Sequence, residues 1–317
     1  MPPSPAETLD ALLCRRLVVV TGKGGTGKTT VSIALGLAAV RRGRRAIVVE
    51  VEGAMRVGPA LGRAPLPYTV REVAPGLDAL SMTSEAALEE FVVRQVRFRG
   101  LYHAVARSRV FGPFMDAVPG LHDIIQVGKV YDLHTETRGH RPRWDVIVLD
   151  APATGHGPTL LAAPLHMMEM TASGPFFANA RRVHELLADP ARTALVLVSL
   201  PESLPVNETL ELHAGLGPFR SQVACCVLDG MHAPPFSSCA AWPGILSHLA
   251  DQPGWAEAAR LADRRMRRAC AEDAARDRLA AALGVPVIPL PHVPHAPLRP
   301  RDHAALAEAL LAARGGA

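Results

Sequence analysis

A strand–loop–helix pattern over residues 17–30 constrains the fold of this chain more than any other feature. The segment, LVVVTGKGGTGKTT, opens with an apolar, β-branched run that is typical of a fully buried parallel strand. A glycine-rich turn comes next, and residues 31–40 continue with a helical pattern. Two glycines separated by four residues, then lysine and threonine, have the spacing of a phosphate-binding loop. The pattern predicts an α/β fold in which this loop holds a nucleotide.

The chemistry of phosphate binding assigns roles within the loop. Glycines let backbone N–H groups turn towards a phosphate without Cβ clashes, and the helix amino terminus adds the positive end of its dipole. Lys28 is expected to reach the β- and γ-phosphates, and the Thr29 hydroxyl is expected to ligate Mg²⁺. The predicted nucleotide-binding residues of the loop are Gly22, Lys23, Gly24, Gly25, Thr26, Gly27, Lys28, Thr29 and Thr30.

The composition fits a globular protein and excludes some partners. The 317 residues suffice for one large domain, and 49% hydrophobic with 20% charged residues is typical of such domains. The net charge of +4 comes without a basic patch interleaved with aromatic residues, so no nucleic-acid partner is expected. Five cysteines form no framework, so a cytoplasmic location is expected. The Pro-rich stretch 1–12 lacks an apolar signal segment and is expected to be a disordered leader.

Further apolar runs alternate with helical segments along the chain. They predict strands at residues 46–51, 77–82, 144–150, 193–200 and 223–228. This alternation predicts a doubly wound, mostly parallel sheet, with all of 1–317 forming a single P-loop domain.

Acidic residues stand at the ends of two of these strands. The strand WDVIVLD ends at Asp150, and Glu52 follows the strand 46–51. Open α/β sheets bind their ligands at the carboxyl ends of strands. We therefore expect Asp150 to hold Mg²⁺ through water, beside the Thr29 hydroxyl.

Three strings in the sequence carry a resemblance to a known family. KGGTGKTT has an early second lysine, Lys23; WDVIVLDAPATGH follows Asp150 with Ala-Pro and Thr-Gly-His; and PESLPVNETLEL begins a later helix. Together they resemble the ArsA and guided-entry family of deviant P-loop ATPases over nearly the whole chain. The match is to single-unit, bacterial-type members, because no internal repeat is evident.

The resemblance implies a dimeric switch ATPase that uses ATP and Mg²⁺. It implies that Lys23 crosses the dimer interface to the partner's phosphates and acts in catalysis with Glu52 and Asp150. It also implies that Asp229 stands at the position that contacts the purine.

The same resemblance implies a helical subdomain contributed by about 84–138 and 160–189. In targeting members of the family this subdomain forms an apolar groove. The methionines of the second segment fit either an adaptable client surface or ordinary helical packing.

Some residues depart from the family pattern. Glu52 stands where the family has aspartate; its extra methylene can misplace the attacking water, so slow hydrolysis is expected. Asp229 replaces an asparagine and can only accept hydrogen bonds, which leaves room for GTP beside the expected ATP. The absence of a CxxC pair argues against a zinc clasp between subunits. Cys225 and Cys226 are adjacent on a strand and would face opposite ways, so we expect small buried hydrophobes, not a metalloid site.

Three functions compete on these grounds. The favoured one is a cytoplasmic homodimer, or heterodimer with a paralogous ATPase, that couples nucleotide state to an apolar client or membrane-protein partner. The second is a positioning ATPase of the MinD/ParA type, against which the long helical insertions and the Thr-Gly-His switch argue. The third is a degenerate, non-hydrolysing half of a heterodimer, suggested by Glu52.

Overall fold

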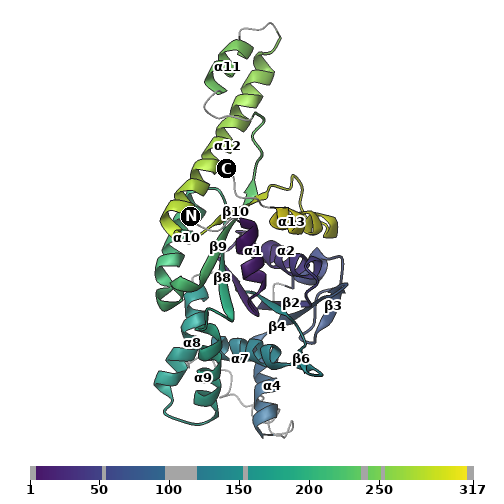
Figure 1. Cartoon of the computed structure of the whole chain (residues 1–317), viewed down its shortest axis with the longest axis vertical. Coiled ribbons are helices and arrows are strands. Elements are labelled where there is room, and N and C mark those ends of the chain that lie inside the picture. Colours follow the sequence, from purple (N-terminus) through teal and green to yellow (C-terminus); the bar gives the residue numbers. More distant parts are fainter. Residues whose placement is uncertain are drawn as a thin grey trace.

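An eight-stranded sheet forms the centre of the protein (Figure 1). The computed structural model describes residues 5–51, 55–96, 120–152, 156–236, 242–250 and 254–312. Across the sheet the strands are ordered β10 (Val287–Pro291), β9 (Val223–Met231), β8 (Thr193–Ser199), β1 (Leu17–Thr21), β7 (Val146–Asp150), β2 (Ala46–Val51), β4 (Leu77–Met82) and β3 (Arg71–Ala74). All neighbours are parallel except β3 and β4. A separate antiparallel pair joins β5 (Thr137–Arg138) and β6 (Arg141–Pro142).

Helices cover both faces of this sheet. They are α1 (Pro5–Leu13), α2 (Lys28–Arg41), α3 (Val57–Ala60), α4 (Ser84–Val96), α7 (Leu121–Thr135), α8 (His156–Met170), α9 (Pro175–Leu187), α10 (Ser203–Gly215), the 3₁₀ helix η1 (Gly217–Gln222), α11 (Trp242–Ala250), α12 (Ala256–Leu283) and α13 (Pro300–Ala312). Each strand predicted from the sequence is present, with its ends shifted by at most three residues. The predicted doubly wound, mostly parallel α/β fold is confirmed.

Two apolar cores lie on opposite sides of the sheet, because side chains alternate along each strand. Leu17 and Val19 of β1 belong to the core that contains residues of α7 to α10, whereas Val18 and Val20 belong to the core that contains residues of α1, α2 and α13. Cys225 and Cys226 divide between the two cores in the same way, and burial raises the pKa of both thiols. The prediction that they are small buried hydrophobes on opposite faces is confirmed.

The amino-terminal segment corrects the prediction of a disordered leader over 1–12. Residues Pro5–Leu13 form α1, and its side chains Leu9, Leu12 and Leu13 are buried in the core beside α13. Their spacing places all three on one face of a helix. Burial of that face stabilises order despite the proline-rich start.

A group of helices packs together at one end of the molecule (Figure 1). The group contains α4, α7, α8 and α9, which are the described parts of the insertions predicted at 84–138 and 160–189. Residues 97–119 of the first insertion lie outside the described residues. The assignment of this group as a functional subdomain stays a prediction.

An arm built from α11 and α12 extends at the opposite end (Figure 1). The helix α12 has 28 residues, which corresponds to about 42 Å of length. Its later turns pack on α10, β9 and β10, and α11 packs along it. Met266 is buried there, whereas the four arginines around it in the sequence 264–268 are exposed, as expected for a solvated face.

Candidate nucleotide-binding site

The loop between β1 and α2 has a backbone that only glycine can follow at several positions. Gly25 and Gly27 have φ angles of +82° and +91°, in the left-handed region that other residues rarely adopt. A Cβ atom on Gly22 would overlap the Val198 carbonyl oxygen of β8. The loop therefore lies tightly against the sheet, with α2 beginning at Lys28.

Lys28 lies inside this loop. Its side chain is buried, and its Nζ donates to the Lys23 carbonyl oxygen at 2.9 Å. The Thr26 hydroxyl donates to the same oxygen at 2.9 Å. Burial lowers the pKa of Lys28, and the nearby Asp150 carboxylate partly offsets that effect. The ammonium group therefore sits in an enclosed position where an anion would compensate its desolvation.

Asp150, at the carboxyl end of β7, receives two hydroxyl groups of α2. Thr29 Oγ1 donates to Asp150 Oδ2 at 2.7 Å, and Ser32 Oγ donates to Oδ1 at 3.1 Å. Burial raises the pKa of Asp150 to about 6 although these hydrogen bonds lower it. A cation next to Asp150 would offset the cost of burying its charge, and hydroxyl and carboxylate oxygens are the ligands that Mg²⁺ prefers. In the described part of the chain no three acidic, histidine or cysteine side chains gather into a metal cage.

A second buried acid, which the sequence reasoning missed, lies beside Asp150. Glu50 of β2 is the register partner of Asp150, is 1% exposed, and accepts the Arg56 backbone N–H at 2.6 Å. Burial raises the pKa of Glu50, and the Arg56 and Val57 amides lower it again. A single acid inside the apolar run AIVVEV was the signal in the sequence. The predicted Glu52 lies outside the described residues.

A cavity of about 810 Å³ brings these groups together. It lies at the carboxyl ends of β2 and β7, where open α/β sheets bind ligands. Its volume suits a nucleotide. Its walls include Gly25, Gly27, Lys28, Thr29, Thr30, Glu50, Arg56, Asp150, Pro297, Leu298 and His303.

Lys23 is not part of the walls of this cavity. Its Nζ lies 3.4 Å from Glu208 Oε1 of α10, and the two side chains are 39% and 27% exposed. The structure therefore places the side chain of the second lysine beside α10, outside the walls of the cavity.

Asp229 of β9 packs against the loop between β1 and α2. A Cβ atom on Gly27 would overlap Asp229 Oδ2, so the carboxyl group lies directly beside the loop. Burial raises the pKa of Asp229 to about 6, and a hydrogen bond from the Gly230 amide only partly opposes it. The carboxyl thus lies next to the region where phosphate charge is predicted.

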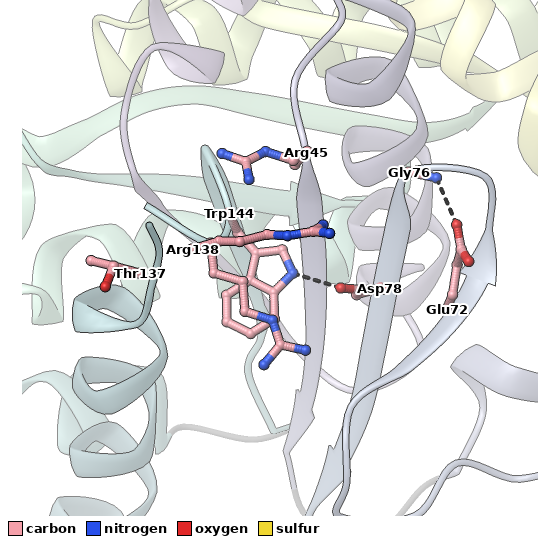
Figure 2. A pocket seen from close by; sticks show the side chains of 8 residues that line it. Arg45, Glu72, Gly76, Asp78, Thr137, Arg138 and Trp144 are labelled. Atoms are coloured by element: carbon pink, nitrogen blue, oxygen red, sulfur yellow. Dashed lines mark hydrogen bonds between the residues drawn. The ribbon is translucent and has the colours of Figure 1, made fainter. Parts of the chain in front are cut away.

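Another cavity, of about 530 Å³, lies at the amino ends of β2, β4 and β7 (Figure 2). Trp144 Nε1 donates to Asp78 Oδ2 at 2.8 Å, and the Arg143 guanidinium stacks 4.3 Å from the centre of the indole. Arg143 also pairs with Glu136 at 2.8 Å. The loop between β1 and α2 lies at the carboxyl ends of the strands, so this cavity is separate from the predicted nucleotide site.

Comparisons with known proteins agree with the geometry of the loop. The model of the family described as "Anion-transporting ATPase" matches residues 15–174. The chain is 35% identical over 202 residues to "ATPase BagA" of Mycobacterium tuberculosis, a match that covers 62% of this chain and 59% of that protein. It is 27% identical over 229 residues to an "Arsenical pump-driving ATPase" of Escherichia coli, covering 67% of this chain and 38% of the relative. The matched region therefore spans less than two thirds of either relative's own length. Within the described residues, no helix is both long and apolar enough to cross a bilayer.

Proposed function

Because the chain belongs to the anion-transporting ATPase family, the ArsA family, we propose that it binds ATP with Mg²⁺ and hydrolyses it at the loop between β1 and α2. The observation that carries this proposal is the convergence of Lys28, Thr29 and Asp150 on one cavity. The names of the similar proteins, which are ATPases, support it.

Each residue has a role in this proposal. Lys28 would exchange the Lys23 carbonyl for the β- and γ-phosphates, because an anion compensates a buried ammonium group better than a neutral oxygen does. Thr29 Oγ1 and, through water, Asp150 would hold Mg²⁺, which supplies positive charge to the phosphate oxygens when bound. Glu52 is proposed to position the attacking water.

Phosphate release from ATP by the purified chain tests the proposal. We expect release that requires Mg²⁺ and that Asp150→Asn abolishes. Asp78→Asn serves as the control. Asp78 lies near the start of β4, the strand beside β2, and lines the other cavity at the opposite edge of the sheet. Equal release from wild type and Asp150→Asn would contradict the assignment.

We propose further that nucleotide drives two copies of the chain, or this chain and a paralogue, into a closed dimer. Lys23 supports this, since its ion pair with Glu208 is partly solvated and such pairs contribute only about 0–1 kcal/mol. Breaking this ion pair therefore costs little free energy, so Lys23 can turn towards a phosphate that a facing subunit presents. Light scattering after size-exclusion of the Glu52→Gln protein, with and without ATP and Mg²⁺, tests the idea. A mass that stays monomeric with ATP excludes nucleotide-driven self-association.

The helices α4, α7, α8 and α9 are the proposed binding element for an apolar client or a membrane-protein partner in the cytoplasm. Met170 of α8 is 56% exposed, whereas Met167 is buried in the core, so the methionines divide between surface and packing. Binding of a fluorescent apolar peptide should differ between the ADP-bound and ATPγS-bound protein. Equal affinity in both states would separate these helices from the nucleotide switch.

A further inference from the structure

Arg56 reaches the nucleotide cavity from the segment that follows β2. Its backbone N–H is held by the buried Glu50 carboxylate at 2.6 Å. The residue before it, Met55, has a φ of +44°, a left-handed conformation that a methionine adopts at a conformational cost. Such strained positions persist where the surrounding structure fixes them, and they cluster at functional sites. The backbone at Arg56 is therefore fixed by the buried end of β2.

The Arg56 side chain shares the cavity with Lys28, Thr29 and Asp150. Burial lowers the pKa of Lys28, and the positive charge of Arg56 adds to that effect. Burial raises the pKa of Glu50, and the amide and the charge of Arg56 partly oppose that rise. Over the ranges that the structure describes, the guanidinium makes no hydrogen bond or ion pair. Arg56 is an exposed residue in the wall of the cavity, so its guanidinium donors are available to an anion bound there.

We propose that the Arg56 guanidinium binds the γ-phosphate of the ATP molecule that is held by Lys28 of the same chain. The inference rests on the proposed ATP binding and hydrolysis, and it does not require a dimer. In the reaction, the water oxygen bonds to the γ-phosphorus, and the bond from that phosphorus to the bridging oxygen breaks. The electron pair of the broken bond leaves with ADP, and the water gives up a proton to solvent. Negative charge spreads over the γ-oxygens, where a planar guanidinium can donate two parallel hydrogen bonds.

This role differs from those of the two lysines. Lys28 is enclosed by the loop and suits the β- and γ-phosphates, whereas Lys23 lies outside the cavity and pairs with Glu208. Arg56 lines the cavity from the segment that follows β2, whereas Lys28 lines it from the start of α2. It should therefore distinguish a nucleotide with a γ-phosphate from one without.

Binding of ADP and of ATPγS to purified protein, measured by calorimetry, tests the proposal without relying on turnover. For Arg56→Ala we expect the Kd for ATPγS to rise about 10-fold or more while the Kd for ADP stays within about 2-fold, because only the γ-phosphate contact is lost. At saturating ATP, kcat should fall about 10²- to 10³-fold, as when one transition-state donor is removed. Arg56→Lys should recover part of the ATPγS affinity and less of kcat, since lysine keeps the charge and loses the fork.

Arg63→Ala is the matched control. Arg63 belongs to the same segment, but its Nε donates to the Val73 carbonyl oxygen at 3.3 Å, outside the cavity. It should leave both affinities and kcat unchanged, and thermal melts should show that all variants fold.

The possible results separate this inference from the proposed function. A wild-type protein that binds neither nucleotide overturns both. A wild type that prefers ATPγS, together with Arg56→Ala that keeps the same preference, overturns the inference alone. An equal loss of ADP and ATPγS affinity in a folded Arg56→Ala protein also overturns it, because that pattern indicates a structural role.

Discussion

Replacing Asp229 by asparagine should stabilise the nucleotide-free protein, and by an amount that depends on pH. Asp229 packs against Gly27, and burial raises the pKa of its carboxyl from 3.8 to about 6. Below pH 3.8 the group is protonated in the folded and the unfolded chain and affects neither. Between pH 3.8 and about 6 the Asp229 carboxyl is ionised in the unfolded chain but still protonated in the folded chain, so the free energy of unfolding falls as pH rises. Above about pH 6 the carboxyl is ionised in both states, and the decrease in the free energy of unfolding stays constant.

The magnitude follows from the two pKa values. A shift from 3.8 to about 6 corresponds to a loss of about 1 kcal/mol at pH 4.5 and about 3 kcal/mol at pH 8. Asparagine has nearly the same shape and no charge, and its side-chain oxygen can still accept the Gly230 amide. Asp229→Asn should therefore be more stable than wild type by about these amounts.

Urea unfolding at pH 4.5, 6 and 8 measures this difference. Glu72→Gln is the control, because Glu72 is an exposed carboxylate on β3 that accepts the Gly76 amide at 3.1 Å. It should leave the pH dependence of stability as in wild type. A gain in Asp229→Asn that is the same at pH 4.5 and pH 8, or no gain at all, would refute the burial argument.

Three further predictions concern the nucleotide. Lys28→Ala should abolish ATP binding, because the phosphates lose their internal counter-ion; micromolar affinity in calorimetry would contradict this. ATP should bind more tightly than GTP. The Asp229→Asn variant should widen this difference in affinity, because an amide can donate and accept hydrogen bonds at adenine whereas a carboxylate only accepts. If the wild type binds ATP and GTP equally and only the variant prefers ATP, Asp229 sets the base choice. Lys23→Ala should bind ATP almost normally but hydrolyse it poorly, and mixing it with Lys28→Ala should recover part of the turnover; no recovery in proven heterodimers would exclude a role across the interface.

The sequence was sufficient where the position of a residue depends on its neighbours along the chain. Lys28 and Thr29 follow a glycine loop within one strand–loop–helix unit, so local backbone geometry alone positions them. Asp150 could also be predicted, because an acid that ends a buried strand has only the carboxyl edge of the sheet to occupy. The opposite faces of Cys225 and Cys226 followed from the alternation of side chains along a strand.

Only the tertiary structure decided which distant residues meet. Thr29 and Asp150 are 121 residues apart, and Glu50 lies beside Asp150 only because β2 and β7 pair in one particular register. Arg56 lines the cavity from a segment whose backbone N–H is held by the buried Glu50 carboxylate, a contact that no local pattern encodes.

Packing likewise decided two outcomes that composition and spacing could not. The segment 1–12 has the composition of a leader, yet Leu9 and its neighbours form a helix because α13 and the sheet offer an apolar surface to cover. Asp229 has a raised pKa because β9 places it against Gly27, 202 positions earlier in the chain. A sequence specifies local conformation and the pattern of burial, but contacts between distant segments depend on strand order, register and the space that remains once the cores are filled.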